Sequence, residues 1–195
     1  MTRPEGTDGV GHVRPRIPRQ SAAGHDRTGA EPDARLTDEL AAVIAGARRR
    51  ALRDGDRQID TAHLLHTLLE CDPEVRAVFG SGPQIARLLG YLVQRSIGYG
   101  LRWQSGVEDS GAVPVLTDVA GWSPVAARAM EDAYGRVERR GGERARGVDL
   151  LAAIVAAPES RAVEVLGRAG IEADELSARI ESGQAGRPAG GDAVR

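Results

Sequence analysis

The fold is decided by two stretches that share one plan: LTDELAAVIAGARRRALRDG at residues 36–55 and WSPVAARAMEDAYGRVERRG at residues 122–141. In each stretch a Thr or Ser that suits a helix N-cap comes before apolar residues at helical spacing, and a glycine ends the run. An offset of 86 residues relates the two stretches and also aligns Leu64-Leu65 with Leu150-Leu151. Because these matches occur in one order, they predict an internal duplication.

Composition divides the 195 residues into five parts. Two blocks, 36–97 and 122–181, each contain four segments with helical periodicity. A glycine-rich linker, 98–121, joins them. Residues 1–35 and 182–195 are rich in Gly, Pro and Arg and have no hydrophobic period, so they are predicted to be disordered. The predicted fold is therefore all-α, with two pseudo-symmetric four-helix repeats between disordered termini.

Cap and breaker residues predict where the inner helices begin. Asp60 or Thr61 is expected to cap the second helix, and Pro83 is expected to open the fourth. Pro158 is expected to open the third helix of the second block, as Pro73 does in the first. A block of about 60 residues has a marginal core of its own, so the repeats are expected to share a buried face. The predicted shared interior consists of the matched leucines Leu64, Leu65, Leu150 and Leu151.

Composition also excludes several classes of function. All 26 basic residues are Arg, and neither Lys nor Asn occurs, which rules out a P-loop lysine, a Schiff-base lysine and N-glycosylation. The net charge of −2 disfavours a protein devoted to nucleic acid. No run of 18 apolar residues and no secretory h-region is present, so we expect no membrane association and a cytoplasmic location.

Two groups of residues are candidates for chemistry. Cys71 is the single cysteine and lies at a predicted helix C-terminus, where the dipole disfavours a thiolate, so a packing role is expected. Asp60, His63, His66 and Glu70 have a spacing that could hold a metal ion. The alternative, which we favour, is that they form the polar face opposite the leucines. We therefore predict no catalytic residue, no cofactor and no metal.

Three stretches resemble the Clp N-terminal repeat. Residues 36–44 resemble its opening, residues 122–130 resemble the opening of its second copy, and residues 59–65 (IDTAHLL) resemble its Gly-Thr-Glu-His-Leu-Leu stretch. The resemblance implies an all-α domain like the one at the front of Clp unfoldases, which receives substrates and adaptor proteins for an AAA+ motor. No motor follows in this sequence, so the resemblance is to a stand-alone N-terminal domain.

The resemblance also bears on ligand binding. In some Clp ATPases the Glu of this motif helps to hold phosphorylated arginine, but the matching positions here are Ala62 and Val148. Their methyl groups cannot accept guanidinium hydrogen bonds, so phosphoarginine binding is not carried over. Thr61 and His63 keep the pattern and are candidate partner-binding residues.

Arginine clusters end the first helix of each block. Arg48, Arg49, Arg50, Arg53 and Arg57 form one cluster, and Arg136, Arg139, Arg140, Arg144 and Arg146 form the other. They are either a surface for acidic partners or nucleic acid, or solvated helix ends, which we favour. Trp122, with Tyr99 and Trp103, either packs at the seam between the repeats or anchors a partner. The candidate partner-binding residues are Thr61, His63, Arg49, Arg53, Arg136, Arg139 and Trp122.

The sequence thus predicts a non-catalytic protein-binding module. Its expected partners are a Clp unfoldase, adaptor or substrate proteins, for which it would act as adaptor, accessory or decoy in Clp-dependent proteolysis. A small peptide-like ligand is a further candidate. Two alternatives stay open: a protein that sequesters small molecules aimed at Clp N-terminal domains, and a nucleic-acid-binding regulator that uses the Arg clusters.

Overall fold

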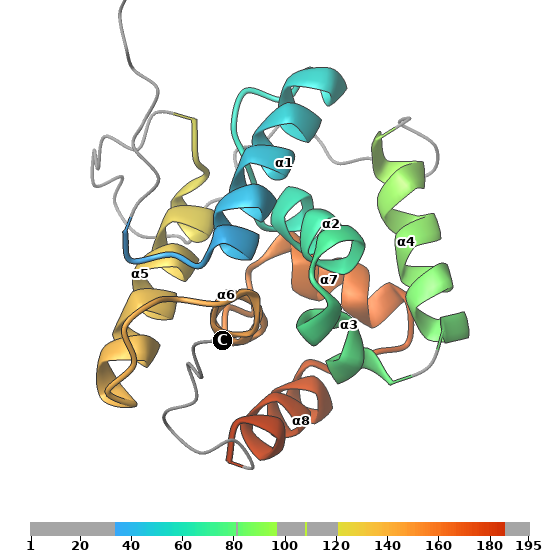
Figure 1. Ribbon diagram of the computed structural model, residues 1–195. Coiled ribbons are helices and arrows are strands. Elements are labelled where there is room, and N and C mark those ends of the chain that lie inside the picture. Colours follow the sequence, from blue (N-terminus) through green and yellow to red (C-terminus); the bar gives the residue numbers. More distant parts are fainter. Residues whose placement is uncertain (1–33, 81, 97–107, 109–120, 186–195) are drawn as a thin grey trace, which may run out of the picture. The chain divides into compact units, whose positions relative to one another are not determined.

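The structure, a computed structural model, describes residues 34–80, 82–96, 108 and 121–185 (Figure 1). Within this part of the chain the regular secondary structure is helical. The helices are α1 (Asp38–Asp54), α2 (Thr61–Cys71), α3 (Pro73–Phe79), α4 (Gly82–Ser96), α5 (Pro124–Arg139), α6 (Gly147–Val155), α7 (Arg161–Arg168) and α8 (Ala173–Ala185). The predicted all-α class is confirmed. Helix α8 runs past the predicted boundary at 181, and most of the predicted tails and linker lie outside the described residues.

Local capping chemistry sets the helix ends. The Thr37 hydroxyl accepts a hydrogen bond from Leu40 N–H and begins α1, and Gly55 ends it with a left-handed φ of 74°. Such a φ strains any residue with a Cβ, so the glycine is required there. Asp60, not Thr61, is the N-cap of α2, and the His63 side chain completes a capping box with it.

The start of α7 corrects the sequence prediction. The helix begins at Arg161, after the N-cap Ser160, and not at Pro158. The Ser160 hydroxyl accepts from Val163 N–H at 3.1 Å and donates to the Ile154 carbonyl at 3.2 Å. A cap that satisfies the orphan N–H groups therefore decides the boundary here, and proline does not. Ser160 is consequently the counterpart of Asp72, the N-cap of α3.

The two repeats pair with each other through two isolated parallel bridges, Leu36 with Ala145 and Ile59 with Trp122. The 86-residue offset of the sequence repeat converts one bridge into the other. The hydrogen bonds follow the same rule, since Thr37 N–H donates to Ala145 O at 3.0 Å and Ser123 N–H donates to Ile59 O at 2.9 Å. Each repeat therefore begins by pairing with the loop before the other repeat's second helix.

The core lies around α2 and α6. Leu64, Leu65, Leu150 and Leu151 are all fully buried, which confirms the predicted interior. In Figure 1, α2 lies near the middle, with α4 and α5 on opposite sides. Every residue of α2 from Thr61 to Leu69 is buried, so most of the polar face expected opposite the leucines lies inside the fold. Within the described residues, none of the helices combines the length and hydropathy needed to cross a membrane.

Candidate functional site

One buried carboxylate joins three helix N-termini. Glu108, from the linker, is only 4% exposed. Its Oε2 accepts from Thr61 N–H at 3.0 Å and from the Ser123 hydroxyl at 2.6 Å. Its Oε1 accepts from Arg161 N–H at 2.7 Å and from the Thr61 hydroxyl. We call Thr61, Glu108, Ser123 and Arg161 the carboxylate junction.

The two hydroxyls of the junction have fixed roles. Thr61 Oγ1 also accepts from Ala162 N–H, and Ser123 Oγ also accepts from Ala126 N–H, both at 3.1 Å. Each hydroxyl proton therefore points to Glu108. Helix dipoles add to the attraction, because Thr61 begins α2 and Arg161 begins α7. Sequence reasoning missed Glu108, since a single acid in a glycine-rich linker has no period or motif around it.

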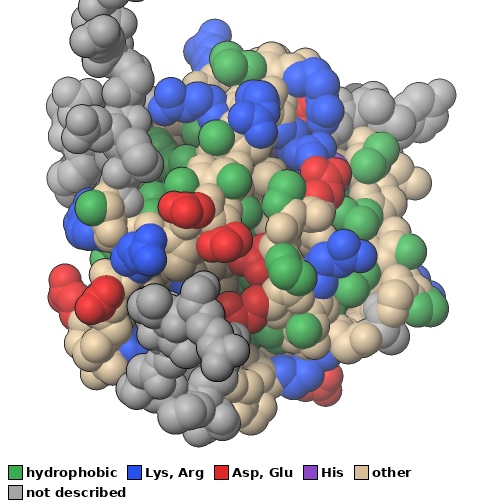
Figure 2. Space-filling view, viewed as in Figure 1, with side chains coloured by type: hydrophobic (Ala, Val, Ile, Leu, Met, Phe, Trp, Pro, Cys, Tyr) green, Lys and Arg blue, Asp and Glu red, His purple; other side chains and the backbone are tan. Residues whose placement is uncertain are grey.

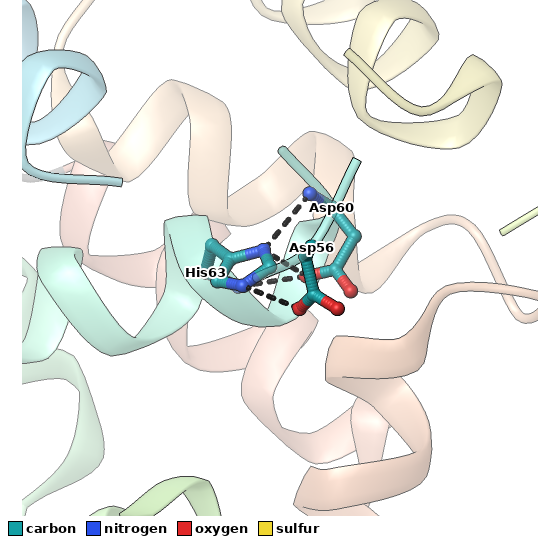
Figure 3. Close-up of side chains that lie close together, drawn as sticks. All are labelled: Asp56, Asp60 and His63. Atoms are coloured by element: carbon teal, nitrogen blue, oxygen red, sulfur yellow. Dashed lines mark hydrogen bonds and ion pairs between the residues drawn. The ribbon is translucent and has the colours of Figure 1, made fainter. Parts of the chain in front are cut away.

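A second buried cluster surrounds His63 (Figure 3). The ring Nδ1 accepts from Asp60 N–H at 3.1 Å, and Nε2 lies 3.0 Å from Asp56 Oδ2. The Asp60 carboxylate accepts from His63 N–H at 2.9 Å and from the Arg161 guanidinium at 2.7 Å.

These contacts bear on metal binding. Asp56, Asp60 and His63 are the group among the described residues that could surround an ion, and His66 and Glu70 of the predicted set are not part of it. Nδ1 and both Asp60 oxygens already hold protein hydrogen bonds. In this structure these atoms serve as a helix cap and as an ion pair with Arg161. The cluster caps α2 and ties it to α7.

His66 belongs to a separate polar set at the other end of α2. Its Nε2 lies 3.3 Å from Glu70 Oε1, and Glu70 Oε2 accepts from the Arg50 guanidinium at 2.5 Å. The pKa of His66 is lowered from 6.5 to about 4, mainly by burial and next by the positive charge of Arg50, against the opposing charge of Glu70. His66 is therefore neutral at pH 7.

The end of α1 presents predicted partner-binding residues to solvent. Arg49 and Arg53 are both exposed, and Leu52 beside them is 73% exposed. Figure 2 shows basic side chains gathered over this end of α1. We call Arg49, Leu52 and Arg53 the α1 surface. Cationic groups around one exposed apolar side chain suit an acidic protein surface.

The other predicted residues lie in different settings. Arg136 pairs with Glu181 of α8, whereas Arg139 is exposed. Trp122 is half-buried and forms the bridge to Ile59, and Tyr99 and Trp103 lie outside the described residues. Arg140 and Arg146 of the same cluster pair with Asp149 and Glu74. Three arginines of this cluster therefore form ion pairs within the fold, and Arg139 is exposed to solvent.

The burial of five further positions completes the comparison with the sequence predictions. Thr61 and His63 are fully buried, so neither side chain is exposed to a partner in this structure. Ala62 and Val148, which stand where the resembled family has Glu, are buried as well. Cys71 is exposed, so the expected packing role is wrong: the last turn of α2 leaves the core behind Leu69.

A groove of about 510 Å³ opens between α3, α6 and α8. Ala77, Val78, Val148 and Ile180 give it apolar walls, and Glu74 and Arg179 add charge. Arg146 lies 3.1 Å from Glu74 through an ion pair that links α3 to the start of α6.

Known proteins match this chain in three-dimensional structure, whereas the comparisons of sequence give no match. No protein-family model and no curated protein sequence matches the chain. Among solved structures, the N-terminal domain of the caseinolytic protease associated chaperone ClpD from Arabidopsis thaliana matches with a TM-score of 0.60 at 21% identity, over 81% of this chain and 99% of that domain. The chain has the Clp N-terminal fold. The Hsp104 N-terminal domain from Candida albicans matches with a TM-score of 0.59 at 11% identity, over 78% of this chain and 93% of that one.

A third structure has the same fold. It is described as part of a malarial protein secretion system and matches with a TM-score of 0.54 at 12% identity, over 76% of this chain and 94% of the other. The resemblance noted in residues 36–44, 59–65 and 122–130 is thereby confirmed at the level of fold.

Proposed function

We propose that the chain is a non-catalytic protein-binding module that acts as an adaptor, an accessory or a decoy in Clp-dependent proteolysis. The observation that carries this proposal is the fold match to the ClpD N-terminal domain over 99% of that domain. The chemistry of the described residues is in keeping with it. Cys71 is the last residue of α2, where the helix dipole disfavours a thiolate, and His63 is engaged as a helix cap.

The α1 surface is the proposed contact region, and its proposed occupant is an acidic surface of the Clp unfoldase or of a protein delivered to it. Its cations would speed association and select against basic partners, and Leu52 would supply apolar area. Arg139, Arg136 and Trp122 are proposed as secondary contacts. Thr61 and His63 stay predictions, because both side chains are fully buried.

The test uses the purified unfoldase and protease of the source organism with an unfolded substrate such as casein. We expect the full chain to bind the unfoldase and to change the rate of casein degradation. Arg49→Glu with Arg53→Glu should weaken this effect at least tenfold, and Arg128→Glu, at an exposed position on α5, should leave it unchanged. The chain alone should hydrolyse neither ATP nor casein. Failure to bind either the unfoldase or its substrates would contradict the proposal.

The groove between α3, α6 and α8 favours a second candidate, binding of a small peptide-like ligand. Its volume of about 510 Å³ lies within the range of small-molecule pockets, roughly 300–1,000 Å³. Ala77 lines it from an exposed turn of α3, and Ala86 is an exposed alanine of α4 away from it. A ligand that raises the melting temperature should lose this effect with Ala77→Arg and keep it with Ala86→Arg. Equal loss with both variants would contradict a groove site.

A further inference from the structure

The carboxylate junction has the donor set of an anion-binding site. Two backbone N–H groups and two hydroxyls, from three different helices, converge on one carboxylate, with two donors for each oxygen. Thr61 is 0% exposed and Ser123 1% exposed, so water does not replace these bonds at the surface. Buried donors without an acceptor cost roughly 1–3 kcal/mol each.

The hydroxyls cannot turn round to serve a neutral or cationic group. Each already accepts from a backbone N–H, Ala162 for Thr61 and Ala126 for Ser123. All four protons therefore point into the same space. An occupant of that space must offer acceptors to four donors, which a planar pair of oxyanion oxygens does and a hydroxyl or amide does not.

The occupant comes from far along the chain, and its charge is balanced by dipoles. Glu108 lies 47 residues from Thr61 and 53 from Arg161. Arg161 turns its guanidinium to Asp60 and offers its backbone N–H to Glu108. The starts of α2 and α7 supply the remaining positive potential. This is how proteins hold a bound carboxylate or phosphate at helix N-termini.

We propose that the carboxylate junction is an oxyanion-binding site that the chain fills with its own Glu108. The ligand class is a carboxylate. The site is closed while Glu108 occupies it and accepts a carboxylate from outside the chain once that side chain is gone. One side chain, that of the linker residue Glu108, is thereby bonded to both repeats. This inference does not depend on the proposed role in Clp-dependent proteolysis, because it concerns a ligand already present in the fold.

The test is chemical rescue in the full chain. Glu108→Ala should lower the melting temperature by several degrees, because it leaves four buried donors without acceptors. Sodium formate should then raise the melting temperature of Glu108→Ala in a saturable way, beyond sodium chloride at the same ionic strength. The wild-type chain should show no such difference, since its site is full. Glu159→Ala, which removes an exposed acid close to α7 in sequence, is the matched control and should behave like the wild type.

Two results would overturn the proposal: Glu108→Ala that melts with the wild type, or formate that acts no differently from chloride on a folded Glu108→Ala chain. If Glu108→Ala does not fold in chloride, recovery of the folded state in formate supports the proposal. Without recovery, Glu108→Gln decides. Its amide sets N–H against the donors, so it should melt below the wild type and show no response to formate. A Glu108→Gln chain as stable as the wild type would show that the charge is not required.

Discussion

The seam between α2 and α7 and the seam between α6 and α3 are counterparts in the duplicated fold, yet they are closed differently. At the second seam Asp72, the N-cap of α3, accepts from Glu74 N–H at 2.9 Å and Val75 N–H at 3.1 Å. Its other oxygen lies against Gly147, where any Cβ would overlap it. At the first seam the N-cap is the shorter Ser160, the facing residue is Thr61, and the carboxylate comes from Glu108.

Both seams of the duplicated fold hold a buried carboxylate, but the two carboxylates come from different parts of the chain. Between α6 and α3 the N-cap Asp72 supplies the carboxylate and faces Gly147. Between α2 and α7 the shorter N-cap Ser160 leaves room beside Thr61, and Glu108 fills it. In that seam the carboxylate belongs to Glu108, which lies outside both repeats in sequence, so the two repeats differ in what their stability depends on.

The largest expected loss of stability comes from the buried leucines of the core that both repeats share. Leu65 and Leu151 are counterparts, and both are fully buried. Replacing either with Ala should lower the free energy of unfolding by about 2–5 kcal/mol, because each leaves a cavity in the shared core. Chemical denaturation measures this loss. Two separate transitions, or a silent change at one position, would show that the repeats are independent.

A pH effect of similar size should belong to the first repeat alone. His66 has Ala152 as its counterpart, and its pKa is lowered to about 4, mainly by burial. Between pH 6.5 and 4 the unfolded chain binds a proton that the folded chain does not. The folded state is therefore fully stabilised with respect to this histidine above pH 6.5. As pH falls toward 4, protonation of His66 in the unfolded chain lowers the free energy of unfolding by roughly 3 kcal/mol.

Denaturation at several pH values checks this prediction. His66→Gln should flatten the pH dependence between 6.5 and 4, and the remaining slope then reports the carboxylates. An unchanged slope in His66→Gln would contradict the assignment to this histidine.

A smaller loss of stability should come from a substitution that affects only the seam between α6 and α3. Gly147→Ala should lower the free energy of unfolding by about 1–3 kcal/mol, because the methyl group overlaps the Asp72 carboxylate. In an Asp72→Ser background, which copies the Ser160 cap, the cost should shrink. Gly135→Ala is the control: its Cβ meets nothing within 4 Å, so it should be neutral or stabilising by up to about 1 kcal/mol. Equal costs in both backgrounds would remove Asp72 from the explanation.

The sequence predicted the parts of this fold that local chemistry determines. Thr37 and Ser123 are recognisable as N-caps, the cap of α2 is narrowed to Asp60 or Thr61, and the matched leucine pairs locate the core. The failures have physical causes. The third helix of the second repeat was misplaced because Pro158 is a visible signal, whereas the Ser160 cap needs the surrounding turn to be recognised.

The interior polar groups could not be predicted for a different reason. The sequence shows that α2 has a polar face opposite its leucines, but it does not show that neighbouring helices bury this face as well. Glu108 gave no signal, since its four donors come from residues 15 to 53 positions away. Such convergence is a property of the assembled fold.

The smallest effect should come from the N-terminal end. A chain that begins at Ala34 keeps Arg35, whose guanidinium lies 4.1 Å from the Tyr134 ring centre and whose carbonyl accepts from Ala145 N–H at 2.7 Å. We expect this shortened chain to melt within about 2 °C of the full chain. Arg35→Ala within it should cost roughly 0.5–1 kcal/mol. A large loss on shortening alone would place a stabilising contact before Ala34.

The contrast between the seams is tested most directly by amide hydrogen exchange in the wild type and Glu108→Ala. The Thr61 and Arg161 amides donate to Glu108, and the Glu74 and Val75 amides donate to Asp72. We predict that Thr61 and Arg161 exchange roughly 10–100-fold faster in Glu108→Ala, as expected for the loss of a hydrogen bond to a charged group, relative to Glu74 and Val75. Equal acceleration of all four amides, or none, would contradict the view that the two seams are closed by different carboxylates.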